Sequence, residues 1–116
     1  MSIIVKTANA SGLLKKITEG IQKKHVTTWM EKDGYLTHDT DQWRYKGWFL
    51  PRVYSDSLVF YIRPPKGGVV TSTAYAIYHG RLSEMLLAHF DSEFTEATSS
   101  AMPDTDGDII KSKTAK

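Results

Sequence analysis

The chain has 116 residues, the usual size of one domain, and its 41% apolar content with 11% aromatic residues is enough for a packed core. It contains no cysteine, which excludes disulfides, thiolate nucleophiles and thiolate metal sites. The net charge is +2, but residues 1–70 hold 11 Lys and Arg against 6 Asp and Glu (+5), while residues 71–116 hold 4 against 7 (−3). Such an asymmetry is compatible with a basic binding surface and an acidic tail.

Targeting signals are weak in this sequence. The apolar run at residues 3–5 is too short for the core of a signal peptide, and no stretch approaches the length of a membrane span. A small secreted domain would also more often carry disulfides. We therefore expect a cytoplasmic protein without a membrane partner.

Residues 2–6 are rich in β-branched side chains, which predicts the first strand. Asn9 then breaks the run and is a good N-cap, because its side chain can accept a hydrogen bond from an amide of the first helical turn. Apolar residues that recur at helical spacing among lysines predict an amphipathic helix after it. These apolar positions are Ala10, Leu13, Leu14, Ile17, Gly20 and Ile21.

A β-hairpin is predicted at Asp33 and Gly34, because both residues tolerate the positive φ angles of a two-residue turn. The extended runs on either side are residues 26–30 and 35–38. With this loop, Trp29 pairs with His38 on one face of the hairpin.

Two further strands are predicted over residues 43–54 and 58–63. Inside the first, Gly47 predicts a bulge or bend, and Pro51 predicts an edge or a local break. Alternation sends one set of side chains toward the predicted helices. That set is Tyr45, Phe49, Leu58, Phe60 and Ile62.

Residues 71–90 are the clearest periodic segment and predict a long helix, with Thr71 or Thr73 as its N-cap. His89 falls near the centre of the apolar stripe, which predicts a buried core histidine. His79 and Arg81 flank the stripe from opposite sides, which argues against a joint acid–base role. The main apolar positions are Tyr75, Tyr78, Leu82, Met85 and Leu86.

The predicted fold is a single α+β domain with the order β-α-β-β-β-β-α, in which two helices pack on one face of an antiparallel meander sheet. We expect this domain to span residues 1–94. Residues 95–116 become rich in Ser, Thr and Asp and contain Pro103, which predicts an acidic, flexible C-terminal tail.

The sheet face turned away from the helices is predicted to be both aromatic and basic. Exposed patches of this kind often mark interaction sites, and Trp, Tyr and Arg are the side chains that anchor protein interfaces. We therefore predict a small protein-binding module, of the adaptor, inhibitor or immunity type, that contacts a protein partner or a second copy of itself. The predicted binding residues are Arg44, Lys46, Trp48, Arg52, Tyr61 and Arg63.

Two other interpretations of this face stay open. Its aromatic rings and cations also suit single-stranded nucleic acid, although the sequence contains no nucleic-acid motif. Alternatively, the long basic side chains lie over the aromatic rings and simply cover one another.

Signals for catalysis are weak. His38 lies beside Asp39 and Asp41, but Asp and Thr are typical of a turn here, and no second histidine stands at a metal-ligand spacing. We predict no catalytic residue, metal site or cofactor, and an enzyme is the least favoured class. A candidate small-ligand pocket between the helices and the sheet contains Trp43, Tyr45, Tyr78, His79 and Arg81.

Overall fold

The computed structural model describes residues 2–102 and 107–110. Its strands are β1 Ser2–Lys6, β2 Trp29–Lys32, β3 Tyr35–His38, β4 Trp48–Val53, β5 Ser57–Arg63 and β6 Glu96–Ser99. Its helices are α1 Ala10–Gln22 and α2 Ser72–Phe90, followed by the 3-10 turn η1 Asp91–Glu93.

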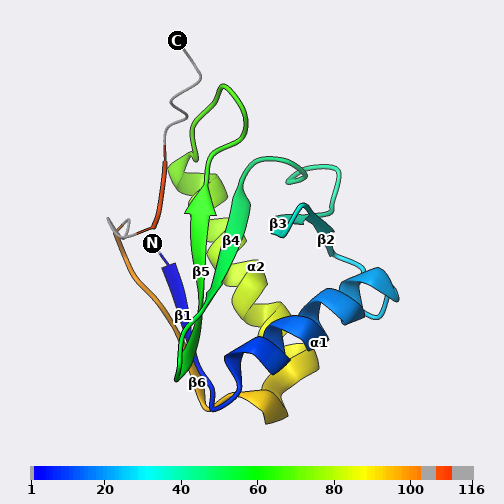
Figure 1. The fold of residues 1–116 in the computed structure, drawn as a ribbon. Coiled ribbons are helices and arrows are strands. Elements are labelled where there is room, and N and C mark those ends of the chain that lie inside the picture. The colour runs from blue at the N-terminus through cyan, green and yellow to red at the C-terminus, as the bar shows by residue number, and fades with distance from the viewer. Residues whose placement is uncertain (1, 103–106, 111–116) are drawn as a thin grey trace.

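The predicted α+β architecture is confirmed. All strand pairs are antiparallel, and the sheet order is β2-β3-β4-β5-β1-β6. The meander β2 to β5 follows the chain, and β1 then inserts between β5 and β6. Figure 1 shows α1 and α2 on the same side of β1 and β5, with β6 at the far margin of the sheet. Neither described helix is long and apolar enough to cross a membrane.

The core lies between the two helices and the sheet, and each large apolar side chain there contributes roughly 1.5–3 kcal/mol of hydrophobic free energy. Alternate residues of β1 and β5 supply the sheet side of the core, as the alternation predicts. Fully or almost fully buried members are Ile3, Val5, Leu13, Ile17, Leu36, Phe49, Leu58, Phe60, Ile62, Tyr78, Leu82 and Leu86.

Both helices begin as predicted. The Asn9 side chain accepts a hydrogen bond from the Gly12 amide at 3.1 Å, and Thr71 Oγ1 accepts one from the Ala74 amide at 3.0 Å. At the end of α1, Lys24 adopts a φ of 61°. This left-handed residue turns the chain so that the following amides donate to the Gly20 carbonyl, which closes the helix.

The predicted hairpin is confirmed in conformation and register. Asp33 and Gly34 have φ angles of 54° and 86°, the positive values that a two-residue hairpin loop requires. Trp29 lies opposite His38, and Met30 lies opposite Thr37.

The predicted strand over residues 43–54 is wrong in its first half. Residues 43–47 form a turn, and β4 begins only at Trp48. The backbone turns because Tyr45 adopts a φ of 62° and because the Tyr78 hydroxyl bonds to the main chain on both sides of it, at Trp43 and Lys46.

The sheet extends past the predicted domain boundary at residue 94. Residues 96–99 form β6, whose pairing with β1 runs from Lys6 opposite Glu96 to Ile3 opposite Ser99. Residues 107–110 also contact the domain, since the Ile109 amide donates to the Ile62 carbonyl. Within the predicted tail, residues 103–106 and 111–116 lie outside the described residues.

The prediction that His89 is a buried core histidine is wrong. His79 is buried, while His89 is exposed. The last turn of α2 faces α1 across an open hollow rather than the sheet, so His89 has no core to enter. His79 lies one turn after Tyr75 and packs against Phe49 of the sheet.

Candidate functional site

The outer face of the sheet divides into a covered part and an open part. In the covered part, Tyr61 is only 5% exposed. The Arg52 guanidinium lies 5.4 Å from the centre of the Tyr61 ring, and the Tyr54 hydroxyl lies 3.2 Å from the Tyr61 hydroxyl. Gly107 lies directly against the ring, where a Cβ atom would come within 2.4 Å. Here the long side chains cover one another, as one of the three interpretations predicts.

The open part lies at the start of β4. Tyr45 is 50% exposed, and its ring stacks on Trp48 with centroids 5.7 Å apart and an interplanar angle of 23°. Arg63 lies opposite Trp48 in the β4–β5 ladder, and Lys46 is exposed between the two aromatic residues in sequence. We call Tyr45, Lys46, Trp48 and Arg63 the aromatic–basic patch.

The turn that carries Tyr45 is held from inside the core. The buried Tyr78 hydroxyl accepts a hydrogen bond from the Lys46 amide at 3.1 Å and donates one to the Trp43 carbonyl. It also lies 3.0 Å from the Thr37 hydroxyl, which donates to the Gly47 carbonyl at 2.8 Å. The Tyr45 ring is therefore presented to solvent by a turn whose backbone is fixed by two buried hydroxyls.

This support is neutral at any ordinary pH. Burial raises the pKa of Tyr78 above its usual value, and the hydrogen bonds it receives only partly oppose that shift. The phenol therefore keeps the proton that it donates to the turn. Holding a non-glycine residue at positive φ costs of order 1–3 kcal/mol, and such strain persists only where the surrounding structure imposes it.

Arg44, a predicted binding residue, is committed to its own turn instead. Its Nε donates to Asp39 Oδ1 at 2.6 Å, and Nη1 lies 3.5 Å from Asp41 Oδ1. The hydrogen bond to Asp39 is the main cause that raises the pKa of Arg44. Because two carboxylates already balance this guanidinium, it adds little free positive charge to the neighbouring patch.

Two cations of the patch lack such partners. No carboxylate of the described residues lies within ion-pair distance of Lys46 or Arg63, and the same holds for Arg52. The Arg63 Nε is buried without an acceptor in the described part of the chain. By contrast, Lys16 pairs with Glu93 and Arg81 with Glu84 on the helical side.

The five residues of the predicted pocket are divided by the structure. Tyr78 and His79 are buried in the core, where His79 Nδ1 lies 2.6 Å from the Tyr75 carbonyl oxygen. Tyr45 is exposed beside Trp48, whereas Arg81 is exposed on α2 and pairs with Glu84. Trp43 contributes its carbonyl group to the Tyr78 network.

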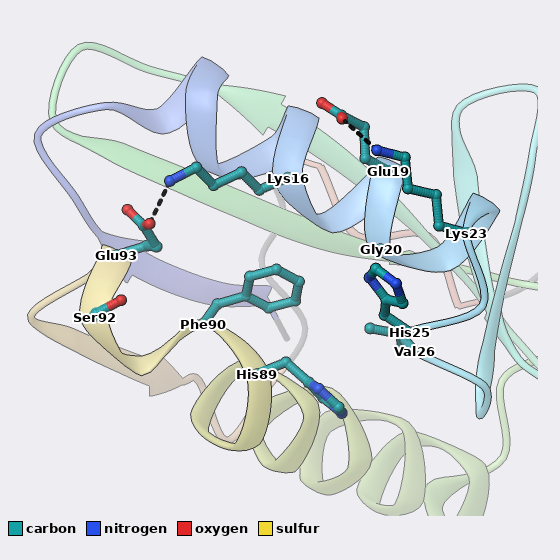
Figure 2. A pocket seen from close by; sticks show the side chains of 10 residues that line it. All are labelled: Lys16, Glu19, Gly20, Lys23, His25, Val26, His89, Phe90, Ser92 and Glu93. Atoms are coloured by element: carbon teal, nitrogen blue, oxygen red, sulfur yellow. Dashed lines mark hydrogen bonds and ion pairs between the residues drawn. The ribbon is translucent and has the colours of Figure 1, made fainter.

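A hollow of about 360 Å³ opens elsewhere, between α1 and the end of α2 (Figure 2). The Phe90 ring lies across the hollow, close to Gly20. A Cβ atom added to Gly20 would be 3.4 Å from this ring. No pattern in the sequence predicts this hollow. The remaining lining residues are Lys16, Glu19, Lys23, His25, Val26, His89, Ser92 and Glu93.

His38 does not assemble a catalytic group. Its Nδ1 lies 3.1 Å from Thr40 Oγ1, while Asp39 is engaged by Arg44. Burial, and then the charge of Arg81, lower the pKa of His38, so the neutral ring is favoured. Residues 2–102 and 107–110 contain no group of three or more His, Asp or Glu side chains that could hold a metal ion.

The exposed position of Tyr45 was missed because strand alternation placed it with the core residues. The exposed position of Tyr45 depends on the turn before β4, which the Tyr78 hydroxyl holds from α2, and no local pattern in the sequence indicates that contact. Comparisons of the chain with models of protein families, with curated proteins and with solved structures found no match.

Proposed function

We propose that this protein is a small binding module that acts in the cytoplasm and recognises another protein, or a second copy of itself, through the aromatic–basic patch. The proposal rests on one observation. An exposed aromatic pair, Tyr45 and Trp48, is fixed in position by the core and flanked by Lys46 and Arg63, which have no carboxylate partner within the described residues.

The physical chemistry of the patch supports this function. Stacked tyrosine and tryptophan rings offer a large contact area with little conformational entropy to lose, because each has only two side-chain torsions. A backbone outlier held by buried hydrogen bonds is a frequent mark of a functional surface. Cations without internal partners favour an acidic surface on the partner and accelerate its association.

The test compares two variants that alter opposite sides of the molecule. The double variant Tyr45→Ser/Trp48→Ser removes the aromatic pair, and Leu87→Ser removes an exposed apolar side chain from α2. The wild type and both variants are immobilised separately, and a lysate of the source cells is passed over each of them. We expect partners that bind the wild type and Leu87→Ser and are lost from the double variant. Partners retained equally by all three proteins would refute the patch as the contact surface.

Self-association through the patch is tested separately. Sedimentation velocity over a range of concentrations shows whether the wild type self-associates and whether the double variant remains monomeric. A dimer that persists in the double variant would place the interface elsewhere.

Single-stranded nucleic acid is the second candidate, and the open Tyr45–Trp48 stack beside Lys46 is the observation that favours it. Base–aromatic stacking tolerates any sequence, and phosphate contacts weaken steeply with salt. Fluorescence anisotropy with a labelled oligonucleotide should show binding at low salt that the double variant loses. No binding at low salt would eliminate this candidate.

A further inference from the structure

Residues 107–110 bind to β5 just beyond the part of this strand that pairs with β1 (Figure 1). Among the described residues, β1 pairs with residues 57–61, so Ile62 is the next residue of β5 along that edge. The Ile62 carbonyl accepts a hydrogen bond from the Ile109 amide at 2.9 Å, and the Ile62 amide donates to Asp108 Oδ1 at 2.8 Å. Both main-chain groups of Ile62 are therefore bonded to residues 107–110, which we call the strap.

The strap contacts the domain as a bound peptide would, rather than as a regular strand. A strand would offer a main-chain carbonyl to the Ile62 amide, whereas here the Asp108 side chain accepts this hydrogen bond. Further along, the Ile110 carbonyl accepts a hydrogen bond from the Val70 amide at 2.7 Å, shortly before α2 begins. The strap therefore bridges β5 and the segment that precedes α2. We call the surface that it contacts, Tyr61, Ile62 and Val70, the edge site.

The edge site fits the side chains of the strap. Gly107 is buried against the Tyr61 ring, and a Cβ atom added there would lie 2.4 Å from ring carbons, so a larger residue does not fit. Asp108 supplies the acceptor for the Ile62 amide, and the Ile110 side chain packs against the hydrophobic core. The edge site is therefore matched to a glycine, an acid directly after it and an aliphatic residue two positions after the acid.

The strap is held less firmly than the strand next to it on β5. β1 pairs with β5 over five residues, and its side chains Ile3 and Val5 are fully buried. By contrast, Asp108, Ile109 and Ile110 are only partly buried. Single hydrogen bonds add little net stability in water, and segments with few buried apolar contacts open locally while the rest of a protein stays folded. The strap can therefore leave the edge site without unfolding the sheet.

We propose that the edge site is a second binding site, for an extended peptide, and that the strap occupies it as an intramolecular competitor. The partner is a segment with a glycine, an acid and, two positions further, an aliphatic residue, because this chemistry is already bound there. It replaces the strap by strand addition, in which hydrogen bonds to the sheet edge provide affinity and side chains provide specificity.

The experiment follows amide chemical shifts by NMR while a capped synthetic peptide with the sequence of residues 107–110 is added to the full chain. Gly107→Val should displace the strap, because the added side chain meets the Tyr61 ring. We expect this variant to bind the peptide about tenfold more tightly than the wild type, whose edge site is mostly occupied, with the largest shifts at Ile62 and Val70. Ala101→Val is the matched control, since it enlarges an exposed residue outside the strap and should bind like the wild type.

Further variants separate the strap from its surroundings. Asp108→Ala removes the acceptor of the Ile62 amide and should also strengthen binding of the added peptide. A peptide with alanine in place of the acid, or valine in place of the glycine, should bind about tenfold more weakly than the original. Tyr45→Ser/Trp48→Ser should bind the original peptide as the wild type does, so this result is independent of the aromatic–basic patch.

Three results would overturn the proposal. The first is equal affinity of the wild type and both strap variants for the peptide, and the second is a set of shifts that excludes Ile62 and Val70. The third is a concentration-dependent dimer of Gly107→Val that excess peptide does not dissociate, because the edge would then serve a second copy of the chain instead.

Discussion

The two faces of the sheet differ in whether their polar groups have partners within the chain. On the helical face, the hydroxyls of Thr37 and Tyr78 and the ring of His79 are buried and hydrogen-bonded within the chain. At the open end of the outer face, Lys46 and Arg63 have no carboxylate partner among the described residues, and the Tyr45 ring is half-exposed.

The difference shows that one short segment, the turn at residues 43–47, can pair buried polar groups on one face and position an exposed ring on the other. Buried polar groups must be satisfied internally, because leaving one unpaired costs about 1–3 kcal/mol. The Tyr78 network meets this requirement by binding the turn at residues 43–47, and the same bonds fix the exposed ring of Tyr45. The covered part of the outer face, around Tyr61, shows that β4 and β5 do not form one uniform binding surface.

The largest expected effect is a difference in stability between substitutions at two neighbouring residues of β4. Phe49→Ala should lower the free energy of unfolding by about 3–5 kcal/mol, because it empties a fully buried site. Trp48→Ala should cost less than about 1.5 kcal/mol, roughly the value of an aromatic pair. Urea denaturation of both variants measures the difference. Equal losses would mean that the outer face is core as well.

Tyr78→Phe removes only the hydroxyl that joins the two faces. We expect a loss of about 2 kcal/mol in the free energy of unfolding, because the Lys46 amide and the Trp43 carbonyl lose their buried partner. We also expect weaker binding through the patch, although no patch residue has changed. Unchanged binding with reduced stability would show that the turn does not need the network to present Tyr45.

A pH effect should come from the helical face. The pKa of His38 is lowered from its ordinary value of 6.5, mainly by burial. The folded state therefore binds a proton at His38 less readily than the unfolded state does. The contribution of neutral His38 to the free energy of unfolding is fully present above pH 6.5 and is lost as the pH falls toward the lower pKa of the folded state. His38→Gln should flatten this decline in urea titrations, whereas Thr40→Val, which keeps the imidazole, should retain it.

The smallest effects compare two residues held at positive φ. Lys24→Gly should raise the free energy of unfolding by about 1 kcal/mol, since glycine adopts φ near 61° without strain. Tyr45→Gly relieves similar strain but loses the stack on Trp48, so its net change should stay below about 0.5 kcal/mol. Only Tyr45→Gly should abolish binding through the patch. Loss of binding in Lys24→Gly would contradict this separation.

The local elements of the fold were largely predictable. Asn9, Thr71 and the Asp33-Gly34 pair act over a few residues, so their caps and turn follow from the sequence. Long-range contacts were not predictable in this way. The Tyr78 hydroxyl holds a turn where alternation predicts the first half of a strand, so that β4 begins only at Trp48, and β6 gains its place only by pairing with β1.

The candidate sites follow the same division. The composition of the outer face predicted Lys46, Trp48 and Arg63, but the neutralisation of Arg44 by two acids of its own turn and the burial of Tyr61 beneath Gly107 depend on tertiary structure. The hollow between α1 and α2 depends on how two distant helices meet, so no local pattern indicated it.

The position of β1 between β5 and β6 has a consequence for how the chain folds as it is synthesised. The strands β2 to β5 can pair in order as they emerge, but β1, made first, must wait for residues 57–63 and then for residues 96–99. Closing such long loops slows folding, and the unpaired first strand is exposed to intermolecular pairing in the meantime. Ile3 and Val5, which are fully buried in the folded protein, therefore stay exposed until β5 has been synthesised.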